Sequence, residues 1–99
     1  MTAETDLFDD VARKVVDLAN ETAEQDAEAD PWDIADGVLS GAIHFWLHSR
    51  QPCSDVSCED CAVVSTSRLR MIELERLVKA FSEESIYYHS TTDHDVAHA

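Results

Sequence analysis

Turn-forming residues are scarce in this sequence of 99 residues, which contains only two glycines and two prolines. An all-β domain needs many turns, and glycine and proline are among the residues that form them. Basic residues are scarce as well, because 7 Lys and Arg stand against 21 Asp and Glu, a formal net charge of −14. Such a chain has no excess of cations with which to displace counterions from nucleic-acid phosphates, and anionic membranes are disfavoured for the same reason. The two shortages exclude an all-β fold and direct binding of nucleic acid or membrane.

Long apolar runs and catalytic motifs are also lacking. No apolar run reaches the ~18–20 residues that a bilayer span requires, and the first residues have neither the basic region nor the apolar stretch of a secretory signal. We find no Ser/His/Asp order, no Gly-rich phosphate loop and no glutamate-flanked histidine pair. Hydrophobic residues nevertheless make up 44% of the chain, enough for a folded core. We therefore expect a folded, cytoplasmic protein without enzymatic activity.

Helical periodicity predicts three helices, at about residues 5–28, 31–48 and 58–84. The first has an acidic outer face and an apolar stripe that we expect to be buried, formed by Leu7, Phe8, Val11, Ala12, Val15, Val16, Leu18 and Ala19. Asp30 and Pro31 are a strong start signal for the second helix. The start of the third is open between Ser57 and Ser67, since Ser65-Thr66-Ser67 interrupts the apolar pattern.

These elements predict an all-α, three-helix domain over residues 1–89, followed by a mobile tail over residues 90–99. Apolar residues on the second and third helices exceed what one inner seam requires, so we expect a homodimer formed through these helices. A larger core within one subunit is the competing explanation. Gly37 and Gly41 leave a flat groove where another helix could approach closely. The alternative is that the two glycines have no role in packing.

Large apolar side chains on the two later helices are candidate partner-binding residues, because aromatic residues and methionine often anchor interfaces. These are Trp32, Phe45, Trp46, Met71 and Phe81.

Three cysteines form the other candidate site, in the pattern Cys53-x4-Cys58-x2-Cys61. Two close-spaced thiolates on a turn are the usual nucleus of a structural zinc site, which takes four N or S ligands. Cys53 would be the third ligand and His48, or His44, the fourth. Two other interpretations stay open: reduced thiols that pack as small apolar groups, and a Cys58–Cys61 redox pair.

The distribution of charge favours a function in protein binding. Residues 1–36 hold 12 acids and 2 bases, whereas residues 37–99 hold 9 acids and 5 bases. The leading hypothesis is a small regulatory or adaptor protein of bacterial type that offers an apolar helix face, rimmed by acid, to another protein. An example is an antagonist of the oligomerisation of a transcription regulator. The alternatives are a zinc- or iron-binding domain built on the cysteines, and an acidic mimic of nucleic acid.

Overall fold

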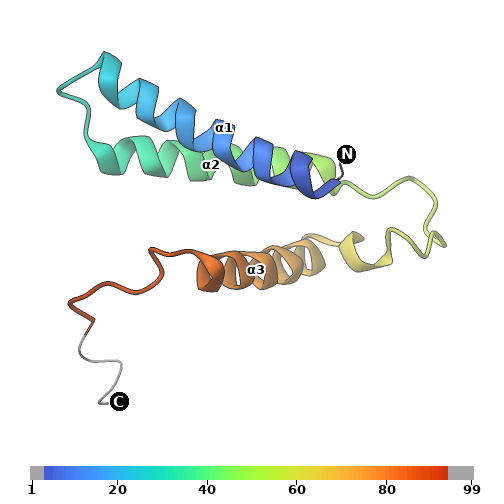
Figure 1. Ribbon diagram of the computed structural model, residues 1–99. Coiled ribbons are helices and arrows are strands. Elements are labelled where there is room, and N and C mark those ends of the chain that lie inside the picture. The colour runs from blue at the N-terminus through green and yellow to red at the C-terminus, as the bar shows by residue number, and fades with distance from the viewer. Residues whose placement is uncertain (1–3, 94–99) are drawn as a thin grey trace. The chain divides into compact units, whose positions relative to one another are not determined.

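A computed structural model describes residues 4–93 of the chain, and within this range it contains three α-helices, one short 3₁₀ helix and no strand (Figure 1). The all-α, three-helix fold expected from the sequence is confirmed. The chain divides into two compact units, Met1–Ser49 and Arg50–Ala99, each of which is considered by itself below. One domain over residues 1–89 stays a prediction. None of the described helices is long and apolar enough to cross a membrane.

The first helix, α1, covers Glu4–Gln25. On its polar face the carboxylate of Asp10 pairs with Arg13 at 2.7 Å and with Lys14 at 3.1 Å. The sequence predicted that this helix would continue to residue 28. The helix ends earlier because Asp26 draws the chain into a turn: its carboxylate accepts from the Glu28 backbone N–H, and its carbonyl accepts from that of Ala29. Such local hydrogen bonds compete with the helical ladder.

The second helix, α2, covers Pro31–Ser49, one residue beyond the predicted end. The carboxylate of Asp30 accepts a hydrogen bond from the Trp32 backbone N–H at 2.9 Å, and its carbonyl accepts from Ile34 at 3.1 Å. Asp30 thus caps the helix and Pro31 occupies its first turn, where no backbone N–H is needed. The start signal that the sequence indicated is confirmed.

Helices α1 and α2 lie side by side and run in opposite directions (Figure 1). Where they approach the connecting turn, small side chains leave a hollow of about 180 Å³, lined by Ala19, Asn20, Ala23, Pro31, Ile34 and Ala35. Further along α2, a Cβ atom added at Gly37 or Gly41 would meet nothing within 4 Å in the structure. The two helices therefore leave a hollow near the turn that joins them, and the strip of α2 that carries the two glycines is open.

The second unit is built around a 3₁₀ helix, η1 (Ala62–Val64), and α3 (Ser67–Glu84). The predicted third helix began at residue 58; the later of the two starts that the sequence left open is observed. Thr66 sets this start, because its hydroxyl accepts from the Leu69 backbone N–H at 3.1 Å. Arg70 on α3 donates to the Val64 carbonyl at 2.8 Å. This hydrogen bond joins η1 to the first turn of α3. Val64 is also the one buried hydrophobic residue of the described chain.

After α3 the chain continues in hydrogen-bonded turns. In one of them the Asp93 carboxylate accepts from the Ser90 backbone N–H at 2.7 Å, and the Ser90 carbonyl accepts from Asp93 at 3.1 Å. Residues 90–93 of the expected tail form this hydrogen-bonded turn, residues 94–99 lie outside the described part of the chain, and the mobility of the tail stays a prediction.

Candidate functional site

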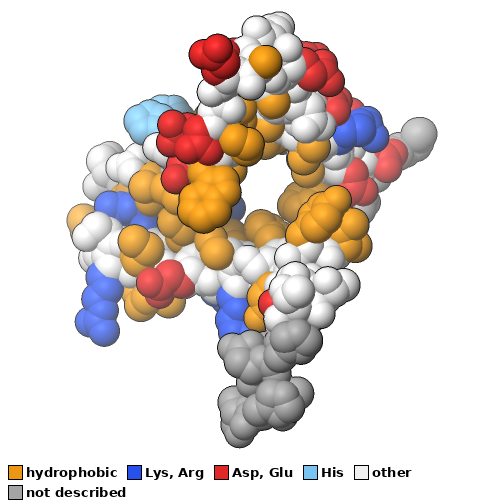
Figure 2. Space-filling model, turned by 90° about the vertical axis from the view of Figure 1, so that its left-hand side faces the viewer, with side chains coloured by type: hydrophobic (Ala, Val, Ile, Leu, Met, Phe, Trp, Pro, Cys, Tyr) orange, Lys and Arg blue, Asp and Glu red, His pale blue; other side chains and the backbone are white. Residues whose placement is uncertain are grey.

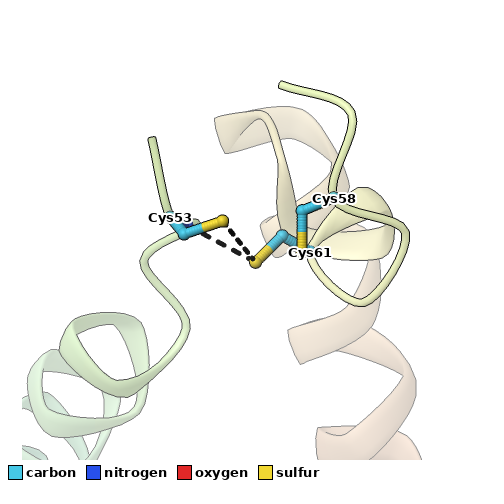
Figure 3. Close-up of side chains that lie close together, drawn as sticks. All are labelled: Cys53, Cys58 and Cys61. Atoms are coloured by element: carbon cyan, nitrogen blue, oxygen red, sulfur yellow. Dashed lines mark hydrogen bonds between the residues drawn. The ribbon is translucent and has the colours of Figure 1, made fainter. Parts of the chain in front are cut away.

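The three cysteines of the sequence motif come together in the second unit (Figure 3). Cys53 belongs to the segment that follows α2, whereas Cys58 and Cys61 belong to the turns that lead into η1. Their three sulfur atoms all lie within 4.8 Å of one another. The sequence thus predicted correctly that these residues form a cluster, although eight positions separate the first from the last.

Cys53 and Cys61 are in direct contact within the cluster. Their Sγ atoms are 3.7 Å apart, and the backbone N–H of Cys53 donates to the Cys61 sulfur at 3.4 Å (Figure 3). The Cys53 thiol also points to the Asp55 carbonyl at 3.8 Å. All three cysteines are free thiols, so the pair is in contact without a covalent bond.

Local turns fix the positions of Cys58 and Cys61. The Asp55 carboxylate accepts from the hydroxyl and the backbone N–H of Ser57, at 2.7 and 3.0 Å, and the Asp55 carbonyl accepts from the Cys58 backbone N–H at 3.1 Å. These bonds hold the carboxylate in its charged form and lower the pKa of Asp55, chiefly through the Ser57 hydroxyl. Beyond Cys61, its carbonyl accepts from the Val64 backbone N–H at 3.0 Å. Because Arg70 on α3 is hydrogen-bonded to Val64, these contacts link the backbone of Cys61 to α3.

The cysteines are accessible from solvent. They line an open hollow of about 350 Å³, together with Pro52, Asp55, Val56, Ala62, Ser65 and Thr66. Cys53 is exposed, and Cys58 and Cys61 are half-buried. An ion or a thiol reagent could therefore reach all three sulfur atoms.

The thiols influence one another's ionisation. Hydrogen bonds from the backbone N–H of Cys61, and then from the Cys61 and Cys53 thiols, lower the pKa of Cys58. The backbone N–H of Cys53 alone would lower the pKa of Cys61, but the thiols of Cys58 and Cys53 together outweigh it and leave that pKa raised. One thiolate is therefore favoured at Cys58, and it discourages a second at Cys61. A bound cation would remove this conflict, since thiolates are the form that binds metal.

The trio could hold a metal ion. The histidines proposed as further ligands, His44 and His48, lie on α2 in the other unit, with His48 in its last turn. Their participation stays a prediction.

The candidate partner-binding residues come from both units. Trp32, Phe45 and Trp46 lie on α2, and Met71 and Phe81 on α3. Four of them are exposed: Trp32 at 80%, Phe45 at 70%, Met71 at 52% and Phe81 at 47%. Trp46 is half-buried.

Sequence reasoning missed a further exposed surface on α1. The apolar stripe of this helix was expected to be buried, but its large side chains are exposed, between 36% at Val15 and 65% at Leu7. We call this surface the α1 stripe: Leu7, Phe8, Val11, Val15, Val16 and Leu18. Its strong amphipathic pattern was visible in the sequence, but the α1–α2 hairpin leaves these side chains exposed.

Figure 2, in which hydrophobic side chains are coloured orange, shows that many of them reach the molecular surface. Comparison of the chain with family models, with curated proteins and with solved structures found no significant match.

Proposed function

We propose that this protein is a non-catalytic adaptor that binds another protein through the apolar faces of its α1–α2 hairpin. A second copy of the chain covers the same faces when no other partner is present. The observation that carries the proposal is the exposure of the α1 stripe, in which six large apolar side chains follow one another along a single helix face. Contiguous exposed apolar surface of this kind marks interaction sites in soluble proteins.

The partner-facing surface extends to α2. Phe45 lies four residues after Gly41 and eight after Gly37, so the three share one helical row. The exposed phenyl ring supplies an anchor, and the glycines allow the partner's backbone to approach closely, since nothing in the described structure fills the space beside them. Trp32, at the other end of α2, supplies a second exposed ring.

The charge of this unit supports a basic partner. Residues 1–36 carry 12 acids and 2 bases, a net charge of −10, and residues 37–49 add no Asp, Glu, Lys or Arg. An apolar face rimmed by carboxylates attracts a surface that is apolar in the centre and basic at its edge, and the field raises the rate of encounter. The same field opposes pairing of two identical hairpins. The self-associated form is therefore readily displaced by a basic partner.

This competition gives the adaptor its mechanism. A partner that uses an apolar, basic surface for its own oligomerisation, such as a transcription regulator, would lose that contact when the hairpin binds it. No bond is made or broken in this process, and the effect depends only on the concentrations and affinities of the competing surfaces.

Two substitutions on α1 test the proposal. Val11→Asp places a charge in the α1 stripe, whereas Asn20→Asp places the same charge on the same helix outside that stripe, where Asn20 lines the hollow beside α2. Val11→Asp is expected to weaken self-association by roughly tenfold or more, since burial of an apolar side chain of this size contributes about 1.5–3 kcal/mol, and Asn20→Asp is expected to change it little. Sedimentation equilibrium measures the self-association of both variants, and circular dichroism checks that each keeps its helicity. Equal effects of the two variants would contradict the proposal.

Added salt identifies which surface covers the hairpin. Two copies repel each other because both hairpins are acidic, so screening by added salt should strengthen self-association. The same screening should weaken binding of the hairpin to a basic partner. Self-association that weakens with added salt would contradict pairing of two acidic hairpins.

A further inference from the structure

We propose that Cys53, Cys58 and Cys61 form a three-thiolate binding site for a zinc ion. The site lies wholly within the second unit and is independent of the protein-binding function proposed above. Its ligands come from two turns and an extended segment, and binding would tie the segment after α2 to the base of α3.

The sulfur positions match the geometry that zinc requires. Zinc–thiolate bonds of about 2.3 Å at tetrahedral angles place neighbouring sulfur atoms about 3.8 Å apart. The Cys53 and Cys61 sulfurs are already 3.7 Å apart. Since all three sulfurs lie within 4.8 Å of one another, a movement of about 1 Å brings Cys58 to the same spacing. The Cys53 and Cys61 sulfurs thus already form one edge of the tetrahedron, and the Cys58 sulfur can reach a third corner by a small movement of its turn.

The backbone around the sulfurs is arranged as a thiolate site needs. The Cys53 N–H donates to the Cys61 sulfur at 3.4 Å, which stabilises negative charge on that sulfur and orients it. The turn made by Asp55 and Ser57 holds the Cys58 backbone. The contact between Arg70 and the Val64 carbonyl fastens the segment that follows Cys61. These bonds come from the protein itself, so little ordering is left to be driven by the metal.

The surrounding charge suits a cation. Between residues 51 and 67 the chain carries three acids, Asp55, Glu59 and Asp60, and no lysine or arginine. Three thiolates added to these carboxylates would repel one another strongly without a counter-charge. On binding, each S–H bond is replaced by a Zn–S bond and the proton passes to solvent, with no change of oxidation state. Three soft sulfur ligands in tetrahedral array favour zinc over magnesium or calcium, and the fourth position is left for water or another side chain.

Cobalt(II) and zinc(II) titrations of the full-length, reduced protein test the site. Cobalt bound by three thiolates in tetrahedral geometry should give intense sulfur-to-metal charge-transfer absorption together with visible ligand-field bands. One equivalent of zinc should abolish both. Zinc should also protect all three thiols from a thiol reagent. Substitution of any one cysteine by serine should lower zinc affinity by roughly 100-fold or more, because even loss of an outer-shell partner costs about 10- to 100-fold.

Val56→Ala is the matched control, since Val56 lines the same hollow, is fully exposed and offers no ligand atom. This variant should bind zinc as the parent protein does. Thiol protection in the parent protein keeps the test valid if a cysteine variant loses helicity. The proposal would be overturned by absence of tetrahedral cobalt bands, by zinc affinity equal in Cys58→Ser and Val56→Ala, or by purified protein that contains iron and sulfide in place of zinc. None of these measurements depends on self-association, so the adaptor function could fail while the metal site stands.

Discussion

Replacement of Phe45 by alanine should weaken association much more than folding. The side chain is 70% exposed in the structure, and full burial of a phenylalanine contributes about 1.5–3 kcal/mol. Burial of the exposed portion of the Phe45 side chain by a partner would therefore contribute about 1–2 kcal/mol to association. The portion already buried within the chain contributes about 0.5–1 kcal/mol to folding. A symmetric dimer that buries Phe45 twice would lose about 2–4 kcal/mol, or roughly 30- to 1000-fold in its dissociation constant.

Sedimentation equilibrium over a series of protein concentrations measures this change directly. Ser40→Ala is the matched control, because Ser40 is an exposed residue of the same helix whose truncation removes little apolar area. Urea unfolding followed by circular dichroism, at a concentration where both variants are monomeric, measures the effect on folding. If Phe45→Ala and Ser40→Ala give the same dissociation constant, the α2 face around Phe45 is not the association surface.

Two further predictions concern the second unit. Thr66→Ala removes the hydroxyl that caps α3 and should lower the unfolding free energy by about 1 kcal/mol, whereas Thr66→Ser should retain most of it; equal melting temperatures would contradict this role. Arg76 donates to Glu73 and lowers the pKa of that carboxyl below its ordinary 4.5. The pair should therefore add stability above pH 4.5 that is lost as the pH falls through the lowered pKa. The effect should be small because the Arg76 side chain is largely exposed and Glu73 is only half-buried, and it should be absent in Glu73→Gln when urea unfolding is followed against pH.

The sequence predicted the helices well where local signals were strong. Asp30 and Pro31 located the start of α2, because a capping carboxylate and a proline in the first turn act within a few residues of each other. The boundaries that differed were decided by competing local hydrogen bonds. Asp26 turns the chain before the predicted end of α1, and Thr66 caps α3 well after residue 58. Both residue types favour caps and turns, but the sequence pattern does not say which of several polar residues will act.

The two candidate surfaces were predictable to different degrees. The cysteine cluster followed from spacing alone, since short turns keep residues three and eight positions apart within reach. The exposure of the α1 stripe did not follow, because amphipathicity identifies a face that needs covering without saying what covers it. In this chain the two helices of the hairpin leave a hollow beside small residues such as Ala19 and Ala35, and the large side chains of the α1 stripe stay exposed.

Light scattering coupled to size exclusion, over a wide range of protein concentrations, tests the central claim most directly. The account predicts a mass that exceeds the 11.1 kDa of one chain and rises with concentration, with the fluorescence of the exposed Trp32 becoming less accessible to a soluble quencher as the mass rises. A mass of 11.1 kDa at every concentration, with both tryptophans shielded from the quencher, would mean that the chain covers its own apolar faces and would contradict the account.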